Sequence, residues 1–346
     1  MDTKQKKKSI ITLCVFMAVL TLLCAFYTLI NPAIIKMFDE KFNIVSNKNA
    51  TIVHFISVGQ GDAAAINLPD GKVLLIDAGP VNSNVTYTKY IQEKVLGSKR
   101  NKKIDYLVMT HADADHIGGV LKLLKNFNVQ NIYMPVVTKE TETFQDLYDY
   151  IYNHEINRID ITDAQNIESE NYSVKFFAPV NNASSNDSCP LVKLVAGNKS
   201  FLFTGDISEN AEKQFVTKYG EELDSDILKV AHHGSKYSSS MEFLSVVSPE
   251  YSIISCGANS YGHPTEQAII NLISSGSVVY RTDLDGNMIF VKSNKYELSF
   301  HAGGYTLTPL SLNYCVLILA IDVVIVVTII DISLKKNKKQ RRKTVE

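Results

Sequence analysis

The feature that most constrains this sequence is a short motif, THADADHIGGV, at residues 110–120. It follows the apolar run IDYLVM at residues 104–109, which predicts a buried strand that ends where the motif begins. The motif carries four side chains of metal-binding type: His111, Asp113, Asp115 and His116. Such mixed nitrogen and oxygen donors suit a first-row divalent ion, and four of them in one short loop favour two adjacent ions. The competing interpretation is a polar surface loop that is rich in His and Asp by chance.

Both ends of the chain carry long apolar segments that predict membrane helices. Residues 9–30 are uncharged, long enough to cross a bilayer, and preceded by four lysines. A signal peptide is the alternative for this segment, but no cleavage site follows it. Residues 310–334 are apolar apart from Asp322 and Asp331, and seven basic residues follow them. An acid at Asp322 indicates a partner helix or a functional role, and the alternative, which we favour, is that it is tolerated in a bundle with the first helix.

The predicted layout places a folded domain between these segments. It comprises a basic cytoplasmic tail (1–8), a transmembrane helix (9–30), a linker (31–50), a folded domain (51–305), a second transmembrane helix (310–334) and a basic cytoplasmic tail (335–346). Because positive charge stays on the cytoplasmic side, both termini are predicted inside the cell membrane and the domain outside it. The domain itself carries 21 Lys and Arg against 30 Asp and Glu, a net charge of −9. Its two cysteines, Cys189 and Cys256, do not predict a disulfide framework.

Short apolar strands and amphipathic helices follow one another through the domain. The predicted strands are 51–58, 63–68, 72–76, 104–109, 132–137, 172–178, 191–195, 201–203, 227–231, 251–255, 278–281 and 288–291. The predicted helices are 87–95, 120–126, 144–156, 208–219 and 266–274. The last two strands are expected to form a hairpin around DLDGN at residues 283–287. This order predicts an α+β domain in which sheets pack together and helices lie outside them.

Further candidate ligands lie beside the ends of predicted strands or just before a predicted helix. They are Asp206, His232, His233 and His263. A rigid scaffold with a site along one edge places its functional side chains on such loops. A carboxylate at Asp206 would be able to bridge two ions about 3.5–4 Å apart, and such a pair lowers the pKa of a shared water.

Other polar residues have weaker claims. Asp62 and Asp77 are candidates to orient ligands, although a turn-forming acid is an equal interpretation of Asp77. His54 and His301 are expected to be structural. His154, in a predicted helix, is expected at the surface rather than at a metal.

Six motifs in this order resemble those of the metallo-β-lactamase superfamily. They are VGQGD (58–62), LIDAG (75–79), THADADHIGG (110–119), GD (205–206), KVAHHGS (229–235) and YGHP (261–264). Within the superfamily they are most similar to the hydrolase domain of ComEC-type DNA-uptake channel proteins, over roughly residues 51–301. The resemblance implies a metallo-β-lactamase αββα sandwich with a dinuclear metal site at its edge, and phosphoester hydrolysis as its chemistry.

The resemblance also implies a role for each matched residue. His111 and Asp113 would bind one ion, Asp115 and His116 the other; Asp206 would bridge them, His263 would complete the second site, and one of His232 and His233 would bind metal or face the substrate. The catalytic candidates are Asp115, His232 and His233. Residues expected to support the ligands or contact the substrate are Asp62, Asp77, Asn186, Ser188, Ser235 and Tyr261. The expected cofactor is two divalent ions, Zn²⁺ or Mn²⁺.

The sequence departs from the family pattern in two respects. Many members have a further histidine, in a Gly-His-x-x-Gly setting, before the bridging Asp, and here only His154 falls in that interval. The ComEC-like group has an Asn- and Ser-containing stretch instead, which residues 186–188 resemble, and an oxygen-rich site would favour Mn²⁺ over Zn²⁺. The many-helix channel of ComEC is also absent. Two membrane spans are not expected to conduct DNA, so the transport role is not carried over.

The leading functional hypothesis is a membrane-anchored, outward-facing dinuclear-metal hydrolase that acts on phosphodiesters through a metal-bound hydroxide. A histidine of HHGS would donate a proton to the leaving oxygen. The net charge of −9 lacks the basic groove that grips a long polyanion, so the phosphodiester is either nucleic acid or a cell-surface polymer. The alternative is a non-catalytic metal-binding module of an envelope or DNA-uptake assembly. A β-lactam hydrolase fits the superfamily but not HHGS and YGHP.

Overall fold

The computed structural model describes residues 49–97, 102–136, 141–163, 165–179, 186–293 and 298–302. These residues belong to one compact unit, Ile44–Gly304. The two predicted membrane helices, 9–30 and 310–334, lie outside the described residues, and their orientation stays a prediction. Within the described ranges, no helix has both the length and the apolar character needed to cross a membrane.

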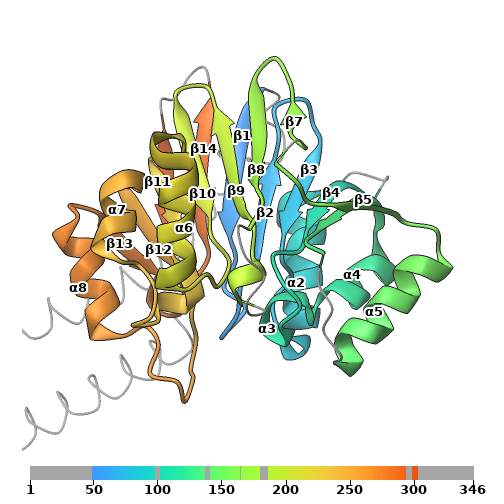
Figure 1. Cartoon of the computed structure of the whole chain (residues 1–346). Helices are drawn as coiled ribbons and strands as arrows, with labels where there is room; N and C mark the ends of the chain where they lie inside the picture. Colours follow the sequence, from blue (N-terminus) through green and yellow to red (C-terminus); the bar gives the residue numbers. More distant parts are fainter. Residues whose placement is uncertain are drawn as a thin grey trace, which may run out of the picture. The chain divides into compact units, whose positions relative to one another are not determined.

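Two sheets form the centre of the unit (Figure 1). The first runs in the order β15 (Ser299–Ala302), β14 (Met288–Ser293), β1 (Ala50–Phe55), β2 (Ala64–Asn67), β3 (Val73–Ile76), β4 (Lys103–Val108), β5 (Asn128–Met134), β6 (Asn157–Asp160). The second runs in the order β13 (Val278–Arg281), β12 (Tyr251–Ile254), β11 (Ile227–Lys229), β10 (Lys199–Phe203), β9 (Leu191–Ala196), β8 (Tyr172–Phe177), β7 (Ile167–Glu168).

Helices cover the outer face of each sheet, on opposite sides of the sandwich in Figure 1. The first sheet is covered by α2 (Asn84–Tyr90), a π-helical stretch (Ile91–Val95), α4 (Val120–Asn126) and α5 (Glu142–Asn153). The second is covered by α6 (Glu209–Tyr219), α7 (Met241–Val247) and α8 (Glu266–Ser274). Two single turns, α3 (Ala114–Ile117) and α9 (Thr282–Asp285), lie in loops. The predicted αββα sandwich is therefore confirmed.

Alternation along β1 shows how the sequence builds these layers. Val53 and Phe55 point between the sheets, where the Phe55 ring stacks on Phe203 at 5.6 Å between centroids. His54 points the other way and bonds to Asn67 Oδ1 at 3.2 Å and to the Tyr90 hydroxyl at 3.0 Å. Because successive strand residues face opposite sides, one strand supplies both the core and the contact with a covering helix. His54 is structural, as predicted.

Two predictions of secondary structure were wrong. The strands at 278–281 and 288–291 do not form a hairpin: β13 pairs in parallel with β12, whereas β14 pairs antiparallel with β1 in the other sheet. The turn α9 and Gly286 carry the chain from one sheet to the other. The helix predicted at 144–156 runs from Glu142 to Asn153, three residues short of the predicted end, and the edge strand β6 begins at Asn157.

Strand direction gathers the motif loops at one end of the sandwich. Strands β3, β4, β5 and β6 run parallel in the first sheet, as do β10, β11, β12 and β13 in the second. Loops that follow parallel strands meet at the same edge, which is where α/β folds place their sites. The loops after β4, β10, β11 and β12 carry the four ligand motifs, near α3 in Figure 1.

Candidate metal centre

Asp206 is the carboxylate around which the candidate site is arranged. It is 3 % exposed and follows β10 through Thr204 and Gly205. Four imidazoles approach it: the Nε2 atom of His116 lies 3.2 Å from Oδ1, and those of His233, His232 and His111 lie 3.6, 3.8 and 3.9 Å from Oδ2. Oδ1 therefore faces an imidazole of the first motif, and Oδ2 faces imidazoles of both the first motif and HHGS.

The donors around Asp206 fall into two groups. One contains Asp115, His116, Asp206 and His233, whose ligand atoms all lie within 4.8 Å of one another. The other contains His111, whose Nε2 lies 3.9 Å from Asp113 Oδ1 and 3.9 Å from Asp206 Oδ2. The two groups share Asp206; Asp115 and His116 lie in the first group, and His111 and Asp113 in the second.

Asp77 fixes the orientation of the first motif through hydrogen bonds to its backbone and side chains. Its carboxylate accepts hydrogen bonds from the Thr110 amide at 2.9 Å and the Thr110 hydroxyl at 2.7 Å. It also accepts a hydrogen bond from Nδ1 of His116 at 2.7 Å. A histidine that donates through one ring nitrogen presents the lone pair of the other, so Nε2 of His116 is left to face Asp206. Of the two interpretations of Asp77, the structure favours the ligand-orienting one.

The backbone of the HHGS motif turns so that its two histidine side chains have different surroundings. His232 and His233 both have positive φ, 49° and 53°, which turns the chain sharply after β11. His233 is buried, donates from Nδ1 to the Ser255 carbonyl at 2.8 Å and directs Nε2 at Asp115 Oδ2, 3.1 Å away. The His232 side chain is 30 % exposed and its ring lies 5.3 Å from that of His263. His233 therefore has the geometry of a ligand, and His232 faces the cleft.

Several buried polar atoms at the site have no hydrogen-bond partner. They include Nε2 of His111 and of His116, Oδ1 of Asp206 and Nδ1 of His263. An unsatisfied buried polar atom costs free energy, and several in one place are tolerated only when something else binds them. Imidazole nitrogen and carboxylate oxygen are ligands of Zn²⁺ and Mn²⁺, so the residues present fit divalent metal ions.

The protonation states of the metal-free site point the same way. Burial lowers the pKa of His111 to about 4, which leaves its imidazole neutral. Burial also opposes the charged form of His233, but the carboxylates of Asp206 and Asp62 outweigh it and raise the pKa of His233 to about 10. Burial likewise disfavours ionised Asp206, yet His116 and His233 hold its pKa well below the usual range. The acids are ionised and attract cations, and a metal ion would replace imidazole protons.

A buried ion pair beneath the centre was not predicted from the sequence. Nζ of Lys229 lies 2.5 Å from Asp62 Oδ2 and donates to the Val230 carbonyl at 2.7 Å. Asp62 Oδ1 lies 3.6 Å from His233 Nδ1, so the ion pair also contacts the candidate ligand His233. The signal was present in the KVAHHGS motif, where a lysine ends an otherwise apolar strand. The contact of Cys189 with the site was not predicted either: its sulfur accepts a hydrogen bond from the Asp206 amide at 3.4 Å.

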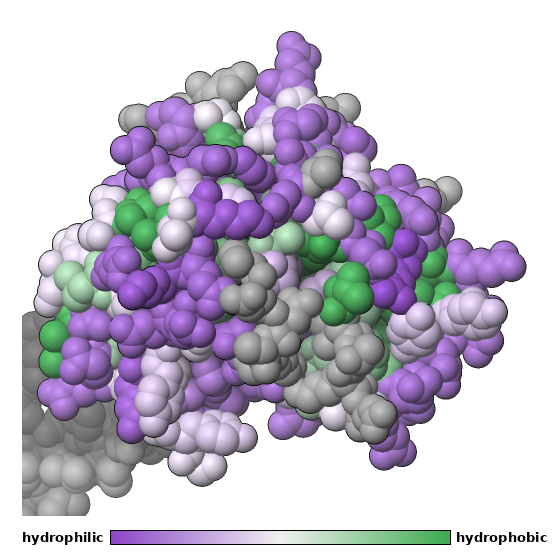
Figure 2. All heavy atoms as spheres, viewed as in Figure 1, coloured by the Kyte–Doolittle hydropathy of each residue, from purple (hydrophilic) through white to green (hydrophobic). Residues whose placement is uncertain are grey.

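An open cleft of about 800 Å³ lies over the candidate ligands. Its lining includes Asp113, Asp115, Asp206, His232, His233, His263, Asn186 and Tyr261. The Tyr261 side chain is 74 % exposed, on a loop whose turns are held by Asn259. Among the residues that line the cleft there is no lysine or arginine. Most of the face seen in Figure 2 is hydrophilic, with apolar residues only in small separate patches.

Some predicted residues lie apart from the cleft. Ser188 and Ser235 are buried and do not line it; the Ser235 amide donates to the His232 carbonyl and so shapes the HHGS turn. His154 caps the end of α5 and stacks on Tyr150 at 3.8 Å, in keeping with the surface position expected for it. The side chain of His301 is outside the described part.

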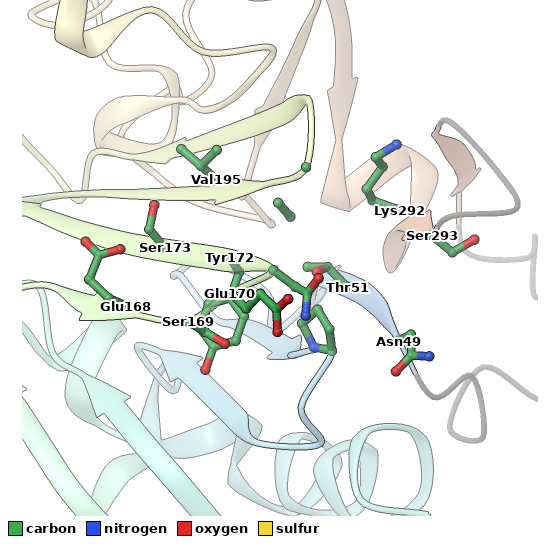
Figure 3. A pocket seen from close by; sticks show the side chains of 14 residues that line it. Asn49, Thr51, Glu168, Ser169, Glu170, Tyr172, Ser173, Val195, Lys292 and Ser293 are labelled. Carbon is green, nitrogen blue, oxygen red and sulfur yellow. The ribbon is translucent and has the colours of Figure 1, made fainter.

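A separate cavity, of about 560 Å³, opens at the end of the strands opposite the metal cleft (Figure 3). Thr51 at the start of β1, Lys292 near the end of β14 and Glu170 in the β7–β8 turn line it. Its lining contains no histidine or cysteine, and all the motif loops follow the opposite strand ends. It therefore contributes nothing to the metal centre.

Comparison with known proteins agrees with this geometry. The family model described as the metallo-beta-lactamase superfamily matches residues 56–258. "ComE operon protein 3" of Bacillus subtilis is 30% identical over 261 residues, covering 70% of this chain and 33% of the relative. "Competence protein ComA" of Neisseria gonorrhoeae is 31% identical over 246 residues, covering 70% and 32%. "Recombination protein 2" of Haemophilus influenzae is 28% identical over 246 residues, covering 68% and 28%.

The chain thus spans about a third of the length of the curated relatives that it matches. Those matches confirm the resemblance predicted from the six motifs, including its similarity to ComEC-type proteins. The matched residues 56–258 contain THADADHIGG, GD and KVAHHGS, and YGHP at 261–264 follows shortly after them. The chain belongs to the metallo-β-lactamase superfamily.

Proposed function

We propose that the chain is a metal-dependent hydrolase of phosphodiesters that holds two divalent ions. The observation that carries this proposal is the shared carboxylate of Asp206. It lies between two groups of ligand-type donors, and the nearest ring nitrogens of His111 and His116 have no other partner. Two ions bridged by one carboxylate are the arrangement that favours displacement at phosphorus.

Each candidate ligand has a defined place in the proposal. One ion would be held by His111, Asp113 and Asp206, and the other by Asp115, His116, His233 and Asp206, with His263 at the cleft side. When bound, such a pair of Zn²⁺ or Mn²⁺ ions activates a water and neutralises phosphate oxygens. The mixed donor set suits either metal.

The chain's own groups at the cleft would orient the substrate. His232 reaches the solvent side of Asp206, so its ring N–H is placed to donate to the leaving oxygen. Asn186 and Tyr261 line the same cleft and would contact the substrate on either side of the reacting group. Asp115 accepts a hydrogen bond from His233. Burial opposes the ionised form of Asp115, but this hydrogen bond and the charges of His116 and His233 outweigh it and lower the pKa of Asp115.

The substrate class follows from what the cleft lacks. Since its lining contains no lysine or arginine, the cleft would bind a phosphodiester mainly through the ions and neutral donors. Either nucleic acid or a cell-surface polymer meets this requirement. The names of the relatives favour a role in competence. We also propose that the apolar segments 9–30 and 310–334 anchor the chain in the cell membrane with both termini cytoplasmic. Asp322 would then lie near a helix partner within the membrane.

The test is hydrolysis of bis-(p-nitrophenyl) phosphate by the full-length chain in detergent. Protein stripped with EDTA is reloaded with Mn²⁺ or Zn²⁺, and bound metal is counted beside turnover. We expect turnover with at least one metal, and a loss of roughly 100-fold or more, together with lost metal, in Asp206→Asn. Asp149→Asn, which changes the same charge on the exposed side of α5, is expected to behave as the wild type.

Bound metal without turnover of this ester, of single-stranded DNA or of a glycerol-phosphate polymer would contradict the hydrolase proposal. That outcome would favour the non-catalytic module. Turnover that survives Asp206→Asn would contradict the proposed arrangement of ligands but not the activity.

A further inference from the structure

A second pocket adjoins the metal cleft across a ridge formed by Pro80 and Val81. Val81 is 55 % exposed and lines both spaces. The second pocket has a volume of about 530 Å³, and its walls come from α3, α4 and α5. Its lining includes Ile117, Gly118, Leu121, Lys122, Lys125, Asn126, Thr143 and Asp146. A ligand that extends out of the cleft over Val81 would enter this pocket.

The two spaces are held in a fixed relation by the single turn α3. Its residues Asp115 and His116 face the metal centre, whereas the next two, Ile117 and Gly118, line the second pocket. A Cβ atom at Gly118 would lie 2.5 Å from the Val81 nitrogen and 2.9 Å from the Pro80 carbonyl carbon. The ridge and α3 therefore pack backbone against backbone, with no room for a side chain between them.

The second pocket supplies the positive charge that the cleft lacks. Lys122 and Lys125 lie three residues apart on α4, so they lie on one face of the helix. Within the described part of the chain, neither ammonium group makes an ion pair; that of Lys125 lies 5.8 Å from the centre of the Tyr150 ring. Asp146 is the acid in the lining, which leaves an excess of one positive charge.

We propose that Lys122 and Lys125 bind a second phosphate of the substrate while its scissile phosphodiester lies at the metal centre. This inference rests on the proposed phosphodiesterase function and specifies its substrate as a chain with more than one phosphate. A single diester gains nothing from this pocket. A substrate with a neighbouring phosphate gains the attraction of both ammonium groups and is held in one register over Val81.

Equilibrium binding tests the proposal without depending on turnover. The probes are dithymidines with a phosphorothioate linkage that carry no terminal phosphate, a 5′-phosphate or a 3′-phosphate, added to the metal-loaded full-length chain. We expect one of the two terminal phosphates to tighten binding roughly five-fold, and 0.5 M NaCl to remove most of that gain. The variant Lys122→Gln/Lys125→Gln should lose the gain and still bind the probe without a terminal phosphate as the wild type does.

The control variant is Lys213→Gln, an exposed lysine on α6, which should keep the full gain. The same comparison with glycerol-phosphate dimers, with and without a terminal phosphate, distinguishes nucleic acid from a cell-surface polymer as the source of the second phosphate. Equal binding of all the dithymidine probes, or a gain that survives in the double lysine variant, would overturn this inference alone. Failure of every probe to bind would overturn the proposed function and this inference with it.

Discussion

The lysine beneath the metal centre shows how one residue supports a highly charged site. Lys229 is 4 % exposed and Asp62 is 5 % exposed, so both charges have lost most of their hydration. A buried pair of this kind offers little net stability, but removing one partner leaves an uncompensated charge in the interior. Lys229 therefore matters mainly through what its loss would leave: a buried carboxylate that has lost its nearest cation and keeps only the more distant His233.

We expect Lys229→Met to lower the free energy of unfolding by about 3–5 kcal/mol because it removes the nearest cation from the buried carboxylate of Asp62. The measurement is urea unfolding of the full-length chain with EDTA present. Lys72→Met is the matched control, since Lys72 and Asp70 lie 2.9 Å apart with partly exposed side chains, and its cost should be below about 1 kcal/mol. Asp62→Asn/Lys229→Met should recover part of the loss. Equal effects of the two single lysine variants would contradict the argument.

Glu212 on α6 makes stability depend on pH. Burial raises the pKa of its carboxyl from 4.5 to about 7, against the hydrogen bonds that it accepts from the amides of Ser239 and Ser240. Between pH 4.5 and 7 the unfolded chain has released this proton while the folded chain keeps it. Stability from this group is therefore present at pH 4.5 and is lost as the pH rises through 7.

We expect Glu212→Gln to remove that dependence, because an amide does not titrate. The free energy of unfolding of the wild type should fall by about 3 kcal/mol relative to the variant between pH 4.5 and pH 7.5. Urea unfolding at four pH values, with EDTA in every sample, measures the difference. A difference that stays constant across this range would show that Glu212 is ionised in the folded chain throughout.

At the same scale, the candidate ligands could be predicted from the sequence but not all their roles. Four of them lie in one local motif, so their residue types and spacing were enough to propose them as ligands: His111, Asp113, Asp115 and His116. His232 and His233 could not be told apart, because the Ser255 carbonyl that fixes His233 comes from another strand. Lys229 was overlooked for a similar reason: its partner Asp62 lies in the first sheet's loop, far away in the sequence.

Among the secondary-structure elements, those with a local signal were predicted well. Helix α8 begins and ends where the sequence placed it, since Thr265 caps its first turn and its apolar positions keep helical spacing. The hairpin expected at 278–291 failed because strand partners are chosen by the whole sheet. Strand β14 pairs with β1, more than 200 residues earlier, and no property of the turn at Gly286 reveals that.

The loop between β12 and α8 depends on one side chain for its form. Asn259 donates from Nδ2 to the carbonyls of Gly257 and His263 at 2.8 and 2.6 Å. Its Oδ1 accepts from the amides of Tyr261 and His263 at 3.0 and 3.1 Å. Four hydrogen bonds from one side chain therefore fix the backbone of the loop that carries Tyr261 and His263 to the cleft.

We expect Asn259→Ala to lower turnover of bis-(p-nitrophenyl) phosphate by about 10–100-fold, because ligands lose effect when their support is removed. Stability should change by less than about 1 kcal/mol, as the loop is largely exposed. Steady-state kinetics and the thermal midpoint, read on the same preparations, separate the two effects. Asn157→Ala, an exposed residue far from the cleft, is the control. A fall in stability that matches the fall in turnover would contradict a local role.

On the scale of the whole domain, the metal centre lies where the two sheets meet. Asp113, Asp115 and His116 follow β4 of the first sheet, whereas Asp206 and His233 follow β10 and β11 of the second. The backbones also touch there: a Cβ atom at Gly257 would lie 2.4 Å from the carbonyl carbon of Gly59. Neither sheet alone contains a complete set of ligands, so bound metal would tie the two halves of the sandwich together.

This position predicts that metal stabilises the domain as a unit. A ligand at 100 times its dissociation constant adds about 2.7 kcal/mol to the folded state, which for a domain of this size corresponds to about 5–10 °C in Tm. Calorimetry of the full-length chain with EDTA, and then with excess Mn²⁺ or Zn²⁺, should show one transition that moves upward by that amount. Because Asp206 belongs to both donor groups, Asp206→Asn should lose the shift, whereas Asp149→Asn should keep it. A shift that persists in Asp206→Asn would mean that metal binds elsewhere, and the bridging position assigned to this carboxylate would have to be given up.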